Sequence, residues 1–547
     1  MGIGAERELR TLERRGIRAN PYRAGRSLTM SRHGIVATSH VLASQAGLDL
    51  LRTGGTAMDA AVAAAATLGV VEPMSVGLGG DVWLLYYEAR TGRVHALNGS
   101  GRSPRRLSPD HFRRRAFKAV PVRSWEAVTV PGAVDAFAAA LERFGRKSLA
   151  AVLTPAIRYA EEGFGVTEVV ARTWKQHEKT LSVDPWARSL YLVDGSAPRA
   201  GEVFRQPRLG ESLKLIAEAG PGAFYRGPIA EEIVRHARES GGFLTLEDFD
   251  QHRSEWVDPI SVNYRGLEVC QCPPNGQGLG VLLMLNILEG FDLAALRLNS
   301  APYLHLLIEA KKLAYADLGR YVGDPAAGSI PIQDLLSKPY AEARRRLIDP
   351  SRAAGRLEPG LRAGSDTVYL ATVDAEGNAA SFISSLFAGF GSGIVGGATG
   401  ILLQNRGAGF TLKPGHPNAY APGKRPYHTI IPAMVLRGGR LYAAFGVMGG
   451  PMQPQGQVQV LLAHLEHGLT MQEAIDLPRW RHMAGREVRL EHGMAHRTAR
   501  GLAALGHRVR PAGGEEFGGA QAIVVDPGTG TYLGASDPRK DGAALGY

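Results

Sequence analysis

The dipeptide Asp366-Thr367 contains the residue whose type and setting best fit a nucleophile. A threonine hydroxyl is a weak nucleophile unless a base lies beside it, and a threonine at a chain N-terminus can use its own α-amine as that base. The pKa of an α-amine is about 7.7–8.0, so a useful fraction is neutral near pH 7. This chemistry requires a backbone cut before Thr367. Taken alone, the residues favour a simpler interpretation, in which Thr367 begins a β-strand with the sequence TVYLATV.

Other nucleophile and cofactor motifs carry less weight. The chain has no G-x-S-x-G elbow. Gly391–Gly396 spells G-x-G-x-x-G, but it lacks the acidic residue about 20 positions on and the helix that a dinucleotide site needs. Cys270 and Cys272 are the only cysteines, and a C-x-C pair cannot supply a four-ligand zinc site by itself. We therefore expect a glycine-rich loop, no metal and no cofactor.

A long stretch of the chain is free of carboxylates. No Asp or Glu occurs from residue 377 to residue 465, while this stretch carries six Lys and Arg residues and three histidines. If the stretch lines a site, that site is electropositive and favours a ligand that bears a carboxylate. It also lacks the ligands that magnesium or calcium prefers. The alternative is that these basic groups lie on solvated loops.

The predicted secondary structure changes near residue 366, from mainly helices to mainly strands. Helical periodicity dominates before it, with predicted helices at 131–145, 148–164, 211–219 and 301–320, and with capping boxes at Thr56-Asp59 and Thr470-Glu473. After it come runs rich in β-branched and aromatic residues, which predict strands. The predicted strands are Thr367–Val373, Ala379–Leu386, Gly400–Gln404, Ile430–Leu436, Leu441–Phe445, Ala522–Val525 and Thr531–Leu533, with Val82–Tyr87 in the first part. This distribution suggests layered α and β structure.

Composition narrows the class of protein. The 547 residues are 44% apolar and 21% charged, which excludes a disordered chain. The net charge is +11, but the basic residues are scattered and not interleaved with aromatics, so we expect no nucleic-acid partner. Residues 1–33 suggest a polar arm without a secretory signal, and no run has the composition of a membrane helix. With only two thiols, the chain fits a reducing compartment, and we expect a cytoplasmic protein without a membrane partner.

Across nearly the whole chain, from about Gly34 onward, the sequence resembles the γ-glutamyltranspeptidase family of N-terminal-nucleophile hydrolases. The matching segments are specific in combination. They include Gly34–His40, Gly54–Ala63, Val71–Pro73, Gly77–Gly80, Val128–Val134, Thr245–Phe249, Tyr321–Pro325, Asp366-Thr367, Phe390–Gly393, Gly400–Leu403, Lys424–Pro426 and Gly449-Gly450.

The resemblance implies a precursor that cleaves itself between Asp366 and Thr367. The products would be a large chain, residues 1–366, in which the large subunit 34–366 follows the arm, and a small chain, residues 367–547, assembled in one four-layer αββα sandwich. The resemblance makes Thr367 both nucleophile and, through its new amine, base. It assigns Gly449 and Gly450 to the oxyanion hole and Ser385 to a hydroxyl that orients the nucleophile. Preorganised donors of this kind act where charge develops during the reaction.

The residues that recognise a glutamyl group depart from the family pattern. Ser100 stands where the family has an arginine for the α-carboxylate, and Arg102 follows two positions later. Gly409 stands where the family has an aspartate for the α-amine, three residues after Arg406. A glycine cannot bind an ammonium group, and a nearby arginine would repel one.

Two further pocket positions differ as well. Phe387 replaces an asparagine of the family, and His428-Thr429 replace a pair of serines. We therefore expect a small-molecule amide substrate with an anionic end, and we count Arg406, Arg102, His428, Thr429 and Phe387 among the candidate substrate-binding residues. Branches of the family that hydrolyse oxamate or glutaryl-type amides are similar in this respect.

Several alternatives stay open at this point. The substrate is either a γ-glutamyl compound of the glutathione type, hydrolysed or transferred, or another anionic amide. A binding protein that kept the fold without cleavage is a different class. Arg406 could instead be a structural arginine paired with Glu72 or Asp81. A homo-oligomer is also compatible with the sequence.

Overall fold

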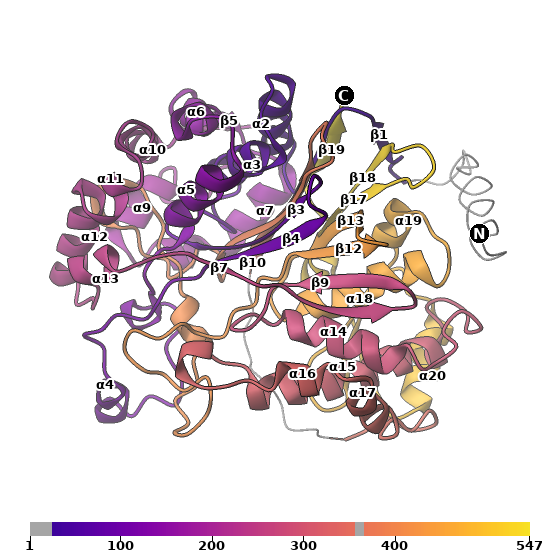
Figure 1. Ribbon diagram of the computed structural model, residues 1–547. Helices are drawn as coiled ribbons and strands as arrows, with labels where there is room; N and C mark the ends of the chain where they lie inside the picture. The colour runs from indigo at the N-terminus through magenta and orange to yellow at the C-terminus, as the bar shows by residue number, and fades with distance from the viewer. Residues whose placement is uncertain (1–24, 356–365) are drawn as a thin grey trace.

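Two seven-stranded antiparallel sheets form the centre of the structure, a computed structural model that describes residues 25–355 and 366–547 (Figure 1). The first sheet has the order β1 (Thr29–Ser31), β18 (Tyr532–Ser536), β17 (Ala520–Val525), β13 (Arg440–Val447), β12 (Ala433–Arg437), β9 (Leu267–Gln271) and β8 (Ile260–Tyr264). The second has the order β19 (Ala543–Gly546), β2 (Ile35–Thr38), β10 (Asp366–Val373), β11 (Ala379–Phe387), β3 (Asp81–Glu88), β4 (Arg93–Gly99) and β7 (Glu255–Val257).

Helices cover the outer face of each sheet. Over the second sheet and beyond its edges lie α2 (Val41–Arg52), α3 (Ala57–Val71), α5 (Ala133–Phe144), α6 (Leu149–Glu162), α7 (Glu168–Gln176), α8 (Glu178–Leu181), α9 (Pro185–Tyr191), α10 (Pro207–Ala219), α11 (Gly222–Tyr225), α12 (Pro228–Glu239) and α13 (Leu246–Asp250) (Figure 1). Over the first lie α14 (Gly278–Leu288), α15 (Ala301–Tyr321), α16 (Ile332–Leu335), α17 (Lys338–Arg345), α18 (Met452–Leu465), α19 (Met471–Asp476) and α20 (His496–Ala504).

The remaining elements are short. They are α4 (Pro109–Arg114), the strand pair β5 (Phe164–Gly165) and β6 (Val203–Phe204), the small sheet of β14 (Trp480–His482), β15 (Glu487–Glu491) and β16 (Arg508–Ala512), and five 3-10 turns: η1 (Trp125–Ala127), η2 (Pro325–Ala327), η3 (Gly397–Thr399), η4 (Arg406–Gly409) and η5 (Gly514–Phe517).

Three apolar cores show the four layers directly. One core joins the first helical layer to the second sheet, a second joins α14, α15 and α18 to the first sheet, and a third lies between the sheets. β10 contributes to two of them, because side chains alternate along a strand. Val368 and Leu370 face the helices, whereas Tyr369, Ala371 and Val373 face the other sheet. The predicted αββα sandwich is therefore confirmed.

Residues before and after position 366 are interleaved in both sheets. β10 pairs with β2 on one side and with β11 on the other, and β11 pairs with β3. In the other sheet, β12 from the second part of the chain pairs with β9 from the first. The predicted large and small chains thus do not form separate domains.

Most predicted elements are confirmed, and the capping boxes at Thr56 and Thr470 are both formed. Gly400–Gln404 was wrongly predicted as a strand, since Leu402 and Leu403 make only isolated bridges there. The predicted polar arm, residues 1–33, is also too long. Thr29–Ser31 already pairs with β18, and residues 1–24 lie outside the described part of the chain.

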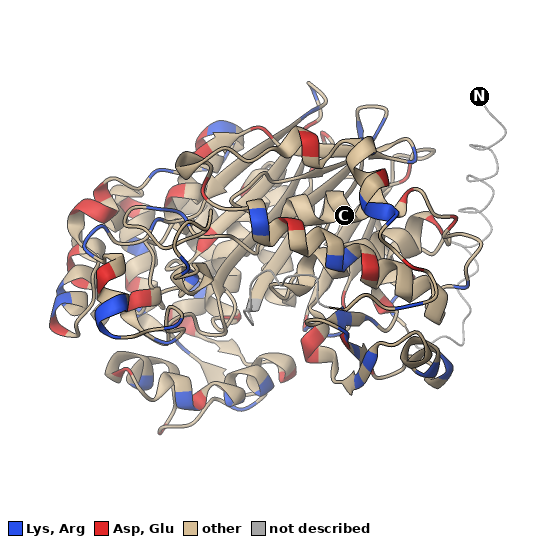
Figure 2. Cartoon of the chain, turned by 90° about the horizontal axis from the view of Figure 1, so that it is seen from below, with Lys and Arg blue, Asp and Glu red and all other residues tan. Residues whose placement is uncertain are grey.

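Charged groups lie mainly on the outer helices and loops. In Figure 2, blue and red segments alternate along these elements, and the central strands are mostly tan. Cys270 and Cys272 are buried free thiols. Across residues 25–355 and 366–547, no helix is both long enough and apolar enough to cross a bilayer.

Candidate active site

Thr367 is the second residue of β10, in the second sheet. The ladder with β11 shifts register between Asp366 and Val368, so Ser385 and Leu386 of β11 lie opposite Thr367 in a β-bulge. Bulges often re-aim a side chain next to an active site. The Thr367 side chain is 1% exposed, and its Oγ1 lies 3.3 Å from the Ser385 Oγ on β11. The Phe387 backbone N–H donates to the same Ser385 oxygen at 2.8 Å. The structure thus brings together the predicted nucleophile and the predicted orienting hydroxyl.

Gly449 and Gly450 form the turn between β13 and α18. The end of β13 lies over the start of β10, because a Cβ placed on Gly446 would meet the Tyr369 ring at 2.4 Å. Tyr369 is two residues after Thr367 and faces the same inter-sheet layer. The turn precedes a 14-residue helix, whose N-terminus carries partial positive charge. This location suits the predicted oxyanion role, which stays a prediction.

Arg406, Phe387 and Thr429 form one buried group. The Arg406 guanidinium carbon lies 4.5 Å from the centre of the Phe387 ring, a cation–π contact. The Nη1 of Arg406 donates to the Thr429 Oγ1 at 2.8 Å. Phe387 has a φ of 81°, rare for a residue with a side chain, so its ring is held at some backbone cost. Nε and Nη2 of Arg406 are buried without a hydrogen-bond partner among the described residues.

Asp81, at the start of β3, organises the polar groups around Arg406. Its Oδ1 accepts from the Gly101 N–H at 2.9 Å and from the Gln404 Nε2 at 2.8 Å. Its Oδ2 accepts from the His428 Nε2 at 3.0 Å and lies 3.9 Å from the Arg406 Nε. Burial would raise the pKa of this carboxyl, but its hydrogen bonds and the neighbouring charges outweigh burial and lower the pKa. Asp81 is therefore ionised.

Burial lowers the pKa values of the two neighbouring basic groups, Arg406 and His428. It lowers the pKa of Arg406 to about 10, against the attraction of Asp81. It also lowers the pKa of His428 to about 4, and the Arg406 charge acts in the same direction. His428 is therefore neutral near pH 7. Its Nδ1 accepts from the Ile430 N–H at 3.4 Å, so the hydrogen-bond network assigns the proton to Nε2, which donates to Asp81.

Arg102 has a different set of partners. Its guanidinium pairs with Asp324 at 3.3 Å and with Glu255 at 3.2 Å, and its side chain is 31% exposed. Arg425 shares the same two carboxylate residues. Ser100, which stands at the expected arginine position, hydrogen-bonds to Asn98. The charge of Arg102 is already compensated, so a role in binding an anion is unsupported by these contacts.

The sequence did not predict the hydrogen bond between Gln404 and Asp81, which holds the polar groups around Arg406, or the buried amide of Gln277. The sequence suggests Asp81 only as an alternative partner of Arg406, and the 3.9 Å ion pair supports that pairing. The available signal was its position directly after the matched segment Gly77–Gly80. Neither glutamine carried a recognisable motif.

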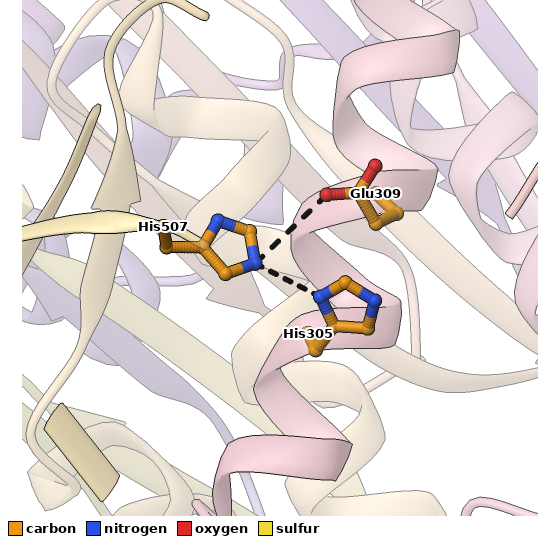
Figure 3. Close-up of side chains that lie close together, drawn as sticks. All are labelled: His305, Glu309 and His507. Atoms are coloured by element: carbon orange, nitrogen blue, oxygen red, sulfur yellow. Dashed lines mark hydrogen bonds and ion pairs between the residues drawn. The ribbon is translucent and has the colours of Figure 1, made fainter. Parts of the chain in front are cut away.

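Among the described residues, one group of three possible metal ligands has all its ligand atoms within 4.8 Å of one another. It lies outside this site and consists of His305, Glu309 and His507 (Figure 3). The contacts within it have another explanation. The His305 Nδ1 and His507 Nε2 share a hydrogen bond of 2.9 Å, and Lys312 donates to Glu309 at 2.7 Å. A divalent cation would lie beside this ammonium group, with one carboxylate to balance both. We treat the cluster as structural, and the expected absence of a metal stays a prediction.

Comparisons with known proteins agree on the class. A cephalosporin acylase from Bacillus halodurans superposes with a TM-score of 0.91 at 42% identity, covering 97% of this chain and 98% of that one. The "Glutathione hydrolase-like YwrD proenzyme" of Bacillus subtilis is 43% identical, covering 94% and 98%. The "Oxamate amidohydrolase proenzyme" of Klebsiella pneumoniae is 36% identical, covering 95% and 100%.

The αββα layers and these neighbours define an N-terminal-nucleophile hydrolase fold. The sequence signature of the family described as Gamma-glutamyltranspeptidase matches residues 43–547. The chain belongs to the γ-glutamyltranspeptidase family.

Proposed function

We propose that this chain is a self-processing amidohydrolase that acts on amides with a carboxylate at the end of the acyl group. Cleavage between Asp366 and Thr367 would yield the active two-chain enzyme. The proenzyme names of two relatives support processing, and the oxamate and cephalosporin names support amide hydrolysis. The observation that carries the substrate class is the buried Arg406, with two donor nitrogens that no described residue satisfies.

Processing begins with the Thr367 hydroxyl, which attacks the carbonyl carbon of Asp366. The C–N bond breaks as the Thr367 nitrogen takes a proton, so the amide becomes an ester on the Thr367 Oγ1. Water then hydrolyses this ester and leaves a carboxyl group on Asp366 and a free amine on Thr367. The Ser385 Oγ, 3.3 Å from the nucleophile, can orient the attacking hydroxyl.

In the mature enzyme, the new α-amine accepts the proton from the Thr367 hydroxyl as the oxygen attacks the substrate amide. Negative charge then develops on the substrate carbonyl oxygen, where the amides of Gly449 and Gly450 would stabilise it. The α-ammonium returns the proton to the leaving nitrogen, and an acyl ester remains on Thr367. Water attacks this ester, releases the acid and regenerates the hydroxyl. Capture by an amine instead of water would make the reaction a transfer.

Arg406 would select the acyl group. A buried guanidinium with two unused donors is costly, and a carboxylate accepts from such a pair in a planar, bidentate arrangement. Asp81 does not replace this ligand, since its Oδ2 lies 3.9 Å from the Arg406 Nε, beyond hydrogen-bond distance.

A γ-glutamyl group also ends in a carboxylate, and the name of the Bacillus subtilis relative favours it as a second candidate. It differs from a glutaryl group by an α-ammonium. With Gly409 where the family has an aspartate, the described site offers this ammonium no uncommitted carboxylate. We therefore place glutaryl- and oxamate-type amides first.

A substrate panel tests the proposal. Glutaryl, γ-glutamyl and butyryl anilides share a leaving group and differ at the acyl end. A charge-assisted hydrogen bond contributes about 1.5–3 kcal/mol, so kcat/KM for the glutaryl anilide should exceed that for the neutral butyryl anilide by roughly 10- to 150-fold. Equal values would contradict the substrate class, and a single uncleaved chain without activity would favour a binding protein.

A further inference from the structure

Gln277 is a buried glutamine at the N-cap of α14, and its backbone is fixed on both sides. Its N–H donates to the His428 carbonyl at 2.9 Å, and the His428 N–H donates to the Asn275 carbonyl at 2.8 Å. The segment before α14 is therefore paired with the strand-like segment that carries His428 and Thr429. This pairing fixes the point from which the Gln277 side chain extends.

The Gln277 amide uses its full donor capacity on two backbone carbonyls. Its Nε2 donates to the Thr429 carbonyl at 2.6 Å and to the Gly450 carbonyl at 2.8 Å. Its Oε1 accepts from the Tyr427 hydroxyl at 3.1 Å. Because all three contacts lie on one planar amide, Thr429 and Gly450 are held at a fixed separation.

Each carbonyl belongs to a different part of the candidate site. Thr429 is the residue whose hydroxyl accepts from Arg406. Gly450 belongs to the turn at the start of α18, where its carbonyl also accepts from the Gln453 N–H at 3.0 Å. Without Gln277, the Thr429 carbonyl would lose this donor and the Gly450 carbonyl would keep only its helical one.

We propose that Gln277 is a positioning residue that couples the Arg406 end of the site to the Gly449-Gly450 turn. Arg406 donates to the Thr429 hydroxyl, and the Gln277 amide donates to the Thr429 and Gly450 carbonyls, so a carboxylate that orients Arg406 would act on the turn through these contacts. The anionic end of the substrate would thereby contribute to the rate of acyl transfer as well as to affinity. This inference rests on the proposed function.

A double-mutant cycle measures the coupling. Gln277→Met keeps the approximate volume and removes both donors. With Arg406 present, we expect it to lower kcat for the glutaryl anilide roughly 10- to 100-fold, the scale of a weakened oxyanion site. In the Arg406→Met background the same change should cost less than about threefold. Equal losses in both backgrounds would overturn the coupling.

Gln459→Met is the matched control. The Nε2 of Gln459 also donates to two backbone carbonyls, of Gln455 and Trp480, each at 3.0 Å. The first contact lies within α18, the second joins α18 to β14, and neither involves Thr429 or Gly450. We expect Gln459→Met to leave the ratio of glutaryl to butyryl turnover unchanged, while Gln277→Met lowers it. The same drop in both variants would contradict a specific role for Gln277.

Gln277→Glu keeps the test decisive if the methionine variant does not fold. An ionised glutamate presents two acceptors to two carbonyls, but a protonated one regains a single O–H donor. Burial raises the pKa of a carboxyl, so we expect the glutamate to change from its ionised to its protonated form within the pH range of the assay. Activity relative to the unmodified protein should therefore rise as the pH is lowered. A constant ratio across pH would overturn the inference.

Different results would contradict the substrate class and the role of Gln277. If the unmodified protein does not prefer the glutaryl anilide, the substrate class is wrong. If the preference is present but Gln277→Met reduces turnover equally with and without Arg406, the proposed function stands and only the coupling is wrong.

Discussion

The Nε of Arg406 and the Oδ2 of Asp81 lie 3.9 Å apart, with both side chains fully buried. At that separation the ion pair has no direct hydrogen bond, and the carboxylate accepts hydrogen bonds from three other groups. Asp81 therefore lowers the cost of burying Arg406 without using its donors. The pair keeps the arginine charged and leaves its Nε and Nη2 for a ligand.

The first prediction concerns self-cleavage. Unmodified protein should give two bands of about 39 and 19 kDa on a denaturing gel, the shares of the 58.5 kDa chain on either side of the Asp366–Thr367 bond. Thr367→Ala should remain one band, because no hydroxyl is available to attack the preceding carbonyl. Thr372→Ala, in the same strand, should still be cleaved. Cleavage of Thr367→Ala at the same bond would show that Thr367 is not the nucleophile.

The second prediction concerns Arg406. Arg406→Met should raise KM for the glutaryl anilide about 10- to 150-fold, because a charged hydrogen bond to the substrate is lost. KM for the butyryl anilide should change little, and cleavage before Thr367 should persist. The measurement is steady-state kinetics on the paired anilides. If both substrates lose equally, or if the precursor fails to mature, Arg406 supports the fold and not the substrate.

The third prediction concerns Gly518, which packs against the glycine turn. A Cβ on Gly518 would lie 2.0 Å from the Met448 carbonyl oxygen, in the peptide that carries the Gly449 N–H. Gly518→Ala should therefore lower kcat, by up to roughly 100- to 1,000-fold if one oxyanion donor is lost. Gly530→Ala is the control, since Gly530 has a φ of 71° against 72° at Gly518 but no atom near its Cβ. Comparable kcat values for the two variants would contradict a contact effect.

The fourth prediction concerns pH. The pKa of His428 is lowered from 6.5 to about 4, so the unfolded state binds the extra proton first as the pH falls. The stabilisation from neutral His428 is complete above about pH 6.5 and is lost towards pH 4. Its size is about 3 kcal/mol, from 1.36 kcal/mol per pKa unit.

His428→Gln tests this dependence, since glutamine can still donate to Asp81 but does not titrate. Protonation of other buried histidines also destabilises the folded protein in this pH range. The informative quantity is therefore the difference in free energy of unfolding between the protein with His428 and the His428→Gln variant. Both should carry Thr367→Ala, so that a single chain unfolds. The difference in free energy of unfolding, from urea titrations, should move in favour of the glutamine variant between pH 7 and pH 4.5. Parallel curves would show that His428 is protonated in the folded state as readily as in the unfolded state.

Local signals predicted the elements near Thr367 well. The run after Asp366 places apolar side chains on both faces of the strand, as expected for a buried strand. The capping boxes at Thr56 and Thr470 satisfy backbone N–H donors within the first turns of their own helices. Such features depend on neighbours in sequence. Gly400–Gln404 has a similar apolar composition, but among the described residues it makes only the isolated bridges of Leu402 and Leu403.

The site was harder to predict, because its contacts join residues far apart in sequence. Asp81 and His428 are separated by 347 positions, and Arg102 acquires its partners Glu255 and Asp324 only through folding. The resemblance located Thr367 and Ser385, which the structure places 3.3 Å apart. It could not indicate which charges are already neutralised in the folded chain, and that property separates Arg406 from Arg102.

The alternation of strands from the two parts of the chain has a thermodynamic consequence for the processed protein. β10 pairs with β2 and β11 pairs with β3, so a chain starting at Thr367 could not leave without breaking both of these ladders. Dilution alone should therefore not separate the two chains, and their dissociation should coincide with loss of the whole fold. Refolding would then require two molecules to meet, so recovery after heating should depend on protein concentration. The precursor, as one molecule, would lack that dependence.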